Sequence, residues 1–285
     1  MALPALARAS ERILQILIGL AFFCMVAGLC SVGVQWYREA AARSQTQCKL
    51  KMMCLGIHGK VSPSDDPMPP SMGRYPVNGP RGSLFFHILP YLECDRIYAD
   101  YKNNYDALET EVVTYKIFCA PTDPTNPGKN TTLTSYASNT AVFGFTDGGS
   151  TRLSKMREGL GSSNAILFME RYAVVGSAGT RHTWPGLGER DNYLYSPDDS
   201  LDPAKIGSPQ FDKAADDACN KVPHAFNRVC LSVGMADGSA RSSDYARRDT
   251  HVHLWRRQNG DRLGLGVQLR RTAGESARAG GMVGE

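Results

Sequence analysis

The sequence has no charged residue between Arg12 and Arg38. Inside that window, the run 13–34 (ILQILIGLAFFCMVAGLCSVGV) has only Gln15 and Ser31 as clearly polar members. Its 22 residues span about 33 Å as a helix, which is close to the hydrocarbon thickness of a bilayer. The core helix of a soluble protein has a polar stripe, and this run has none. We therefore predict a transmembrane helix at 13–34.

Two other interpretations of this run stay open. One is a buried core helix, and the other is a cleaved signal peptide. The apolar part of a signal peptide is about 7–15 residues long, shorter than this run. The small residues at 27–30 (AGLC) that loosely resemble a cleavage site also lie deep inside the run. An uncleaved anchor accounts best for the pattern.

Helix-breaking residues are missing as well. No proline occurs between Pro4 and Pro63, and no glycine between Gly33 and Gly56. The segment 35–55 is rich in good helix formers, so we predict one helix that continues from the span into an amphipathic half, with two helices broken at the membrane surface as the alternative. Small and apolar residues recur in it at helical spacing, and we expect this stripe to pack on the rest of the protein: Tyr37, Ala41, Ser44, Cys48, Met52 and Leu55.

Known catalytic signatures are absent: there is no Gly-x-Ser-x-Gly, His-Glu-x-x-His, phosphate-binding loop or dinucleotide-binding glycine pattern. We expect no enzyme and no cofactor. Three groups of metal-compatible side chains have simpler explanations as turn, loop or tail residues, so we predict no metal site. These groups are His224 with Asp237, His251 with His253, and Asp198 with Asp199 and Asp202.

The net charge of +4 over 285 residues and a hydrophobic fraction of 42% exclude a polytopic membrane protein, a fibre and a wholly disordered chain. Residues 1–60 carry +5, residues 61–245 carry −5, and residues 246–285 carry +4. The excess is too small, and the body too acidic, to suggest nucleic acid. The basic tail favours solubility, or contact with an anionic surface.

Orientation in the membrane stays open on residues alone. Arg8 and Arg12 lie in the tail 1–12, while four basic residues follow the span, which slightly favours a cytoplasmic C-terminal side. Six cysteines lie outside the span, an even number that suits disulfides in an exported domain, and six unrelated thiols are the alternative. They are Cys48, Cys54, Cys94, Cys119, Cys219 and Cys230.

The body of the chain covers residues 35–263. Strand patterns occur at 114–118, 135–145, 165–170 and 229–236, and Asp237-Gly238 predicts a type I′ hairpin leading to a strand at 239–243. The prolines in 61–82 predict an irregular loop. We expect a long irregular insertion at 176–223 and disorder at 264–285.

Six short motifs follow one another over residues 35–245. Their residues are Arg38, Glu39, Pro90, Tyr91, Leu92, Cys119, Pro121, Asp123, Pro124, Asn164, Glu170, His224, Asp237 and Gly238. In this order the motifs resemble a bacterial family of unknown function with a prepilin-like N-terminus and a C-terminal His-x9-Asp-Gly motif. The family's N-terminal cleavage sequence is absent here, and 12 residues rather than nine separate His224 from Asp237.

The resemblance implies a pilin-like α+β domain at 35–263, in which one long helix packs on an antiparallel sheet. It further implies that this domain is exported across the inner (cytoplasmic) membrane with the N-terminus inside. It also implies a Cys48–Cys119 disulfide between helix and sheet. The expected partners are the lipid bilayer and other copies or pilin-like proteins, bound through residues 13–55. A tethered, monomeric binding module for a small molecule or glycan is the alternative function.

Overall fold

The computed structural model describes residues 3–61, 65–109, 111, 113–144, 152–158, 161–186, 193–194, 210–211, 213–218, 222–226, 230–244, 252–255 and 266–269. The chain divides into two compact units, Met1–Ser44 and Gln45–Glu285. The first helix, α1 (Leu3–Val61), is continuous over 59 residues. The predicted single helix is therefore confirmed, and the alternative of two helices is wrong.

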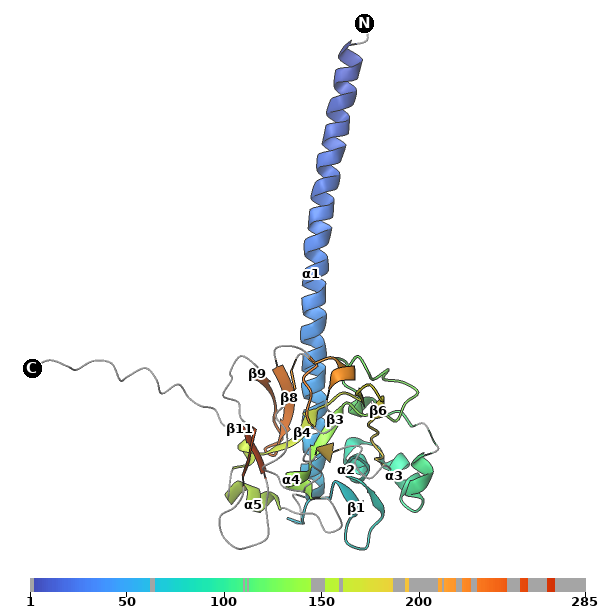
Figure 1. The fold of residues 1–285 in the computed structure, drawn as a ribbon, viewed down its shortest axis with the longest axis vertical. Helices are drawn as coiled ribbons and strands as arrows, with labels where there is room; N and C mark the ends of the chain where they lie inside the picture. Colours follow the sequence, from blue (N-terminus) through green and yellow to red (C-terminus); the bar gives the residue numbers. More distant parts are fainter. Residues whose placement is uncertain are drawn as a thin grey trace, which may run out of the picture. The chain divides into compact units, whose positions relative to one another are not determined.

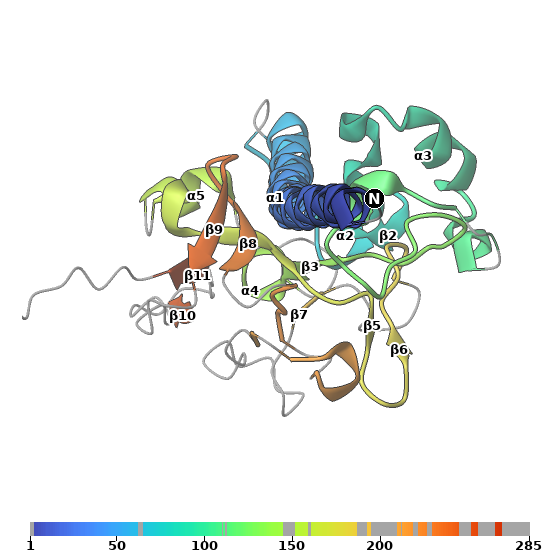
Figure 2. The same cartoon turned by 90° about the horizontal axis from the view of Figure 1, so that it is seen from above.

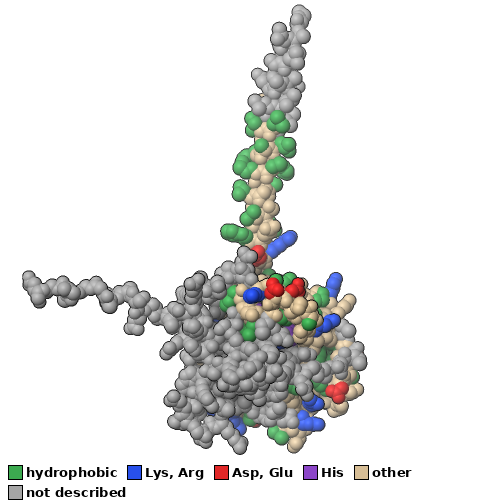
Figure 3. Space-filling view, viewed as in Figure 1, with side chains coloured by type: hydrophobic (Ala, Val, Ile, Leu, Met, Phe, Trp, Pro, Cys, Tyr) green, Lys and Arg blue, Asp and Glu red, His purple; other side chains and the backbone are tan. Residues whose placement is uncertain are grey.

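The N-terminal part of α1 carries apolar side chains that are open to the surroundings, as Figure 3 shows along its visible face. Among the described residues, this is the one helix that is long and apolar enough to cross a membrane. Within this apolar stretch, Ser31 Oγ donates a hydrogen bond to the Gly28 carbonyl oxygen, so this polar group has a partner inside its own helix.

The part of α1 that belongs to the second unit buries the opposite face from the one predicted. Of the predicted stripe, Cys48 is exposed, and Met52 and Leu55 are 45% and 51% exposed. The predicted stripe and the row that is buried instead both have helical spacing, but they are offset by two positions, which is about 200° around the helix. The rest of the second unit covers the buried row, whose members are Thr46, Leu50, Met53, Cys54, Ile57 and Val61.

A five-stranded sheet has the order β7-β3-β4-β8-β9 (Figure 1). Its central pairs are antiparallel, and the short strand β7 runs parallel to β3 at one edge. The fold is thus a mixture of helices and sheet that follows a long N-terminal helix in the chain. The strands are β3 (Tyr136–Asn139), β4 (Ile166–Glu170), β7 (Tyr193–Leu194), β8 (Cys230–Met235) and β9 (Ala240–Asp244).

The strands predicted at 165–170, 229–236 and 239–243 are confirmed as β4, β8 and β9, within a residue or two at their ends. The strand predicted at 135–145 is correct only to Asn139, after which the chain forms α4 (Thr140–Phe143). The ladder stops there because the Asn139 side chain takes over: its Nδ2 donates to the Ile166 carbonyl oxygen at 2.9 Å.

Two other predictions of local structure are wrong. The strand predicted at 114–118 is instead the 3-10 helix η3 (Lys116–Phe118), which places Phe118 between Phe85 and Trp184 in the core. The loop predicted at 61–82 contains a hairpin of β1 (Met72–Arg74) and β2 (Arg81–Ser83). Its prolines lie outside the two strands, so they remove no hydrogen bond from the ladder.

Short helices and one further hairpin complete the body. The hairpin of β5 (Val174–Val175) and β6 (Thr180–Arg181) follows β4. The helical segments are α2 (Leu84–Ile88), η1 (Leu89–Leu92), α3 (Asp95–Tyr101), η2 (Tyr105–Glu109), α5 (Leu153–Glu158), η4 (Ser162–Asn164) and η6 (Ala215–Asp217).

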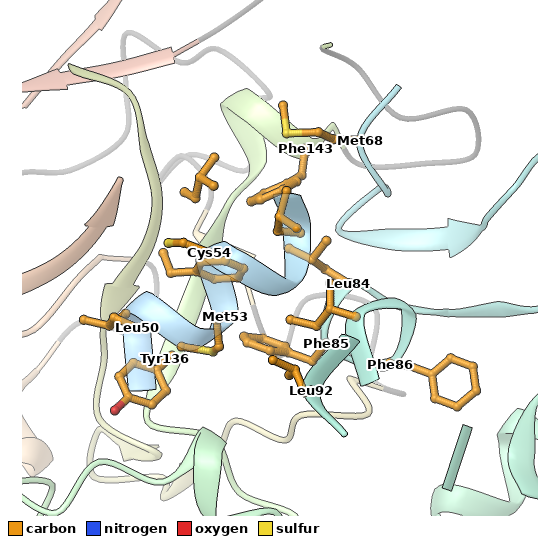
Figure 4. Close-up of a cluster of buried hydrophobic side chains, with 14 of the residues drawn as sticks. Leu50, Met53, Cys54, Met68, Leu84, Phe85, Phe86, Leu92, Tyr136 and Phe143 are labelled. Carbon is orange, nitrogen blue, oxygen red and sulfur yellow. The ribbon is translucent and has the colours of Figure 1, made fainter. Parts of the chain in front are cut away.

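The main core lies where α1, α2 and one face of the sheet meet (Figures 2 and 4). Figure 4 shows Leu50, Met53 and Cys54 of α1 beside Phe85 of α2 and Tyr136 of β3. The other face of the sheet carries a smaller cluster, which includes Ile166, Met169 and Val233. A bulge in β4 between Ile166 and Phe168 interrupts the alternation of this strand, so that the successive residues Leu167 and Phe168 both join the main core.

The helix passes close to β8 at Gly234. A Cβ on this residue would lie 2.6 Å from Cys54 Sγ and 3.5 Å from the Leu50 carbonyl oxygen. Because Cβ contacts at the shorter distance are essentially never seen, a side chain at this position would force Cys54 Sγ to shift, whereas glycine fits the contact between α1 and the sheet.

The hairpin between β8 and β9 is confirmed, but its turn is not type I′. The Gly238 N–H donates to the Met235 carbonyl oxygen, and Gly238 has φ +82° while Asp237 does not have positive φ. A type I′ turn needs positive φ at both central residues, whereas one left-handed glycine after a type I turn gives a three-residue loop with a bulge.

The C-terminal region contains a second small sheet, in which β10 (Val252–Trp255) pairs antiparallel with β11 (Gly266–Leu269). The prediction of disorder at 264–285 is therefore wrong for 266–269. The sequence of β11 alternates apolar and other residues, and β10 does so as far as Leu254, a pattern that suits pairing; the high Gly and Arg content of the tail obscured it. Most of the predicted insertion at 176–223 lies outside the described residues.

Candidate functional site

The strongest chemical feature of the first unit is its exposed apolar surface. The large apolar side chains between positions 17 and 34 are 40–71% exposed. Consecutive positions such as Phe22 and Phe23, 62% and 69% exposed, point about 100° apart, so the surface surrounds the helix instead of forming one stripe. A helix that is apolar all round belongs in a protein core or a bilayer, and none of this stretch is buried.

Arg38 and Glu39, the first two residues of the family resemblance, follow this apolar stretch on α1 and are exposed. The next motif, Pro90, Tyr91 and Leu92, forms η1. This motif packs on the end of α1, because a Cβ on Gly56 would lie 3.1 Å from Leu92 Cδ2 and one on Gly59 would lie 3.1 Å from Tyr91 Cδ1. The role of the motif is thus to pack against the helix.

Asp123 lies in the turn that begins at Cys119 and contains Pro121 and Pro124. Its Oδ1 accepts hydrogen bonds from the Thr125 N–H and hydroxyl at 2.9 and 2.7 Å, and its Oδ2 accepts from the Ala173 N–H at 3.0 Å. Only 4% of Asp123 is exposed. Burial raises the pKa of this carboxyl, and the hydrogen bonds oppose that shift.

Glu170 and His224 are buried at the end of β4, beside the segment that Asp123 binds. Glu170 Oε2 accepts a hydrogen bond from the Ser232 N–H at 2.8 Å, and the His224 N–H donates to the Glu170 carbonyl oxygen at 3.0 Å. His224 Nδ1 accepts from the Tyr172 N–H at 3.4 Å, and its ring stacks on Tyr172 at 5.3 Å between centroids. Both side chains thus join separate stretches of the main chain.

Three residues of the resemblance that are far apart in sequence therefore meet around 170–173. Asp123, Glu170 and His224 each accept a hydrogen bond from a main-chain N–H, so this cluster stabilises the arrangement of the main chain. Sequence reasoning did not identify their neighbours, Arg171 and His182, which are also buried. Arg171 is a charged residue directly after a strand, and nothing in the sequence around it indicated that it would be buried.

Asp237 and Gly238 lie at the other end of β8, since Ile166 pairs with Met235 while Glu170 contacts Ser232. His224 and Asp237 are therefore not brought together. Asp237 Oδ1 accepts from the Ser239 N–H and hydroxyl, and its Oδ2 accepts from Arg241 at 3.0 Å. Although partial burial acts to raise it, the pKa of Asp237 is lowered by these hydrogen bonds and the Arg241 charge.

The same hairpin contacts α1. His58 Nε2 lies 2.9 Å from the Ala236 carbonyl oxygen, and Gln47 Nε2 donates to Ser242 Oγ at 2.7 Å. Sequence reasoning missed both contacts, and it missed the close approach at Gly234, for which a glycine inside a strand pattern was the available signal. Asn164, at the end of η4, donates its N–H to the Gly161 carbonyl oxygen in the turn before β4.

Cys48 and Cys119 are free thiols in the structure, so the disulfide implied by the resemblance is not formed in it. Cys48 is exposed and Cys119 is 5% exposed. Lys49 connects the same two regions instead, since its Nζ donates to the Cys119 carbonyl oxygen at 2.6 Å. Burial lowers the pKa of Lys49 and raises the pKa of Cys119.

The part of the chain that the structure describes holds no group of three or more His, Cys, Asp or Glu side chains arranged for a metal ion. Asp198, Asp199, Asp202 and His251 lie outside the described residues, and His253 lies in β10. Comparisons of the chain with protein-family models, with curated proteins and with solved structures find no match. The physical features above therefore carry the functional argument.

Proposed function

We propose that this chain is a membrane-anchored protein of pilin-like plan, whose second unit lies outside the cytoplasm and acts by assembly or surface interaction. One observation carries the proposal: a charge-free stretch of α1, residues 13–37, exposes apolar side chains on every side, and the same helix continues without a break into the core of a mixed helix-and-sheet body.

The energetics support a bilayer as the partner of this helix. Moving one large apolar side chain out of water is favourable by about 1.5–3 kcal/mol. Ten such side chains between positions 17 and 34 are at least 40% exposed. A surface of this size is unfavourable in water and ordinary in lipid, where the backbone hydrogen bonds of a helix are already satisfied.

The polar residues support a binding or structural role over catalysis. Asp123, Glu170 and His224 are buried acidic and imidazole side chains of the resemblance, and each is engaged with the main chain. The packing of α1 on one face of the sheet supports the pilin-like part of the proposal, in which one helix would belong to both the membrane and the body.

Membrane fractionation with alkaline extraction tests the anchor. A Leu20→Lys/Phe23→Lys variant places two charges in the middle of the apolar run, each unfavourable by about 2.5–3.5 kcal/mol for insertion. We expect this variant to leave the membrane fraction. The matched control, Met52→Lys/Leu55→Lys, changes exposed apolar residues of the second unit and stays membrane-bound. Extraction of the wild type at alkaline pH would contradict the proposal.

Orientation and assembly need two further measurements. A membrane-impermeant maleimide added to spheroplasts labels Cys48 if the second unit lies outside the cytoplasm, and fails to label it until lysis if the unit lies inside. Crosslinking in intact membranes through residues 13–55 gives helix-to-helix multimers if the protein assembles. A strict monomer favours instead a tethered module that binds a small molecule or glycan.

A further inference from the structure

Two glutamines bound the most apolar part of α1. Gln15 and Gln35 are 20 residues apart, which is about 30 Å along a helix and matches the hydrocarbon thickness of a bilayer. Both are exposed. Ser31 is the one clearly polar side chain between them, and it is already hydrogen-bonded within the helix. The two glutamines therefore lie at the spacing expected for the two boundaries of a hydrocarbon layer, and the helix need not tilt to match it.

Directly after Gln35 stand two large aromatic residues with unusual exposure. Trp36 is 73% and Tyr37 is 76% exposed, although such side chains bury much of their area in most folds. Trp and Tyr concentrate at membrane–water interfaces, where the ring contacts the acyl chains and the polar group reaches the headgroups. Their exposure is unfavourable in water and suits this layer.

Arg38 follows the aromatic pair, so that an apolar stretch, two aromatic residues and a cationic residue succeed one another along α1. It is exposed and is the first charged residue after the span. Its long side chain can extend toward lipid phosphates while its methylene groups stay in the apolar layer. Positions 36, 37 and 38 are successive on the helix and point about 100° apart, so together they contact the interface around more than half of the circumference.

We propose that Trp36, Tyr37 and Arg38 form an interfacial anchor that binds the phospholipid headgroup layer and fixes the depth of α1 in the bilayer. The boundary on the opposite side is then at Gln15. This inference rests on the proposed membrane function and adds to it which residues meet which layer of the lipid.

Depth-dependent fluorescence quenching tests the anchor. The full chain is reconstituted in phosphatidylcholine vesicles that contain phosphatidylcholine with a nitroxide either near the glycerol backbone or near the end of the acyl chain. The chain has three tryptophans, and the difference in signal between the wild type and Trp36→Phe isolates Trp36. This leaves Trp184, which is fully buried, undisturbed. The control places a tryptophan mid-span by Leu29→Trp in the Trp36→Phe background.

We expect Trp36 to lose more fluorescence with the shallow nitroxide than with the deep one, and the Leu29→Trp tryptophan to show the reverse order. Stronger quenching of Trp36 by the deep nitroxide overturns the anchor. So does absence of quenching by either label while the Leu29→Trp tryptophan is quenched. If that control is quenched by neither label, the helix is not inserted, and the proposed function fails with the anchor.

A second variant tests whether these residues fix the depth. Trp36→Leu/Tyr37→Leu, added to Leu29→Trp, keeps the apolar area but removes the preference for the interface. We expect the ratio of deep to shallow quenching at position 29 to change. An unchanged ratio would show that the aromatic pair does not set the depth. Tyr91→Leu, which removes a 42%-exposed aromatic residue from the second unit, is the matched control and leaves the ratio unaltered.

Discussion

Replacing Gly234 by alanine tests the contact between α1 and the sheet. The added Cβ would lie 2.6 Å from Cys54 Sγ, while the next atoms, Leu50 O and Leu50 Cβ, would be at 3.5 and 3.7 Å, which are ordinary contact distances. The clash is therefore with one atom. Gly234 does not have positive φ, so alanine fits the backbone conformation.

Two opposing effects set the size of the expected change. Overpacking a buried position costs about 1–3 kcal/mol. Replacing glycine by alanine where the backbone permits it stabilises by about 0.4–1 kcal/mol, because the unfolded chain loses freedom. The clash is the larger effect, so we expect Gly234→Ala to lower the free energy of unfolding by about 1–2 kcal/mol.

Removing the sulfur should reverse the effect. In a Cys54→Ala background the new methyl group fills the space of the missing thiol, so Gly234→Ala becomes neutral or stabilising. The coupling between the two positions is then favourable, within the range of about 0.5–3 kcal/mol found for residues in contact. Cys230→Ala is the matched control, since this cysteine is also buried, lies on β8 and is not the atom that clashes.

The assay is urea unfolding of the detergent-solubilised full chain, followed by the fluorescence of buried Trp184. The reasoning requires a loss on Gly234→Ala that disappears in the Cys54→Ala background and persists in the Cys230→Ala background. Equal losses in all three backgrounds would refute it, because the close approach of α1 to β8 would then not be the cause.

Three further predictions concern the second unit. Leu50 is fully buried, so Leu50→Ala should lower the free energy of unfolding by about 2–5 kcal/mol. Leu55 is 51% exposed, so Leu55→Ala should lower it by less than about 0.5 kcal/mol. If urea unfolding gave similar losses for the two variants, the wrong face of α1 would be assigned to the core. Because the pKa of Asp237 is lowered from 3.8 by hydrogen bonds that outweigh burial, its stabilisation is fully present above pH 3.8 and is lost as the pH falls through the folded value. Asp237→Asn should therefore be less stable than the wild type near neutral pH, by under about 1 kcal/mol, with a difference that shrinks at acidic pH; a constant difference would exclude the ionised carboxyl as its source. In the native protein, maleimide should label Cys48 quickly and Cys119 only after unfolding. If the peptides that contain Cys48 and Cys119 stayed linked until a reductant was added, the two cysteines would instead form a disulfide.

The sequence predicted the elements whose signal is local. The continuity of α1 follows from the absence of proline between Pro4 and Pro63 and of glycine between Gly33 and Gly56, and the hairpin of β8 and β9 follows from two runs around Asp237-Gly238. In each case the residues of the element themselves set the backbone conformation. The predicted turn type was nevertheless wrong, because only Gly238 has positive φ and the loop has one residue more.

The buried face of α1 could not be predicted, because two rows of residues share the same helical period. The row through Leu50 and Ile57 is buried and the row through Met52 and Leu55 is exposed. Which row packs depends on Gly234 and the sheet face opposite, far away in sequence. The cluster of Asp123, Glu170 and His224 depends in the same way on strand register, which joins positions that no local pattern relates.

These long-range contacts also explain why the boundary between the two units falls inside a helix. The prediction placed the end of the span at residue 34, where the apolar run stops, but the second compact unit begins at Gln45. From there on α1 supplies Leu50, Met53, Cys54, Ile57 and Val61 to the core, all fully buried. A body cut free at the end of α1 would lose these side chains, each worth about 1.5–3 kcal/mol of burial, against the 5–15 kcal/mol that stabilises an ordinary domain. The last turns of α1 are therefore part of the folded body, and the same helix must be present for the sheet to have a core.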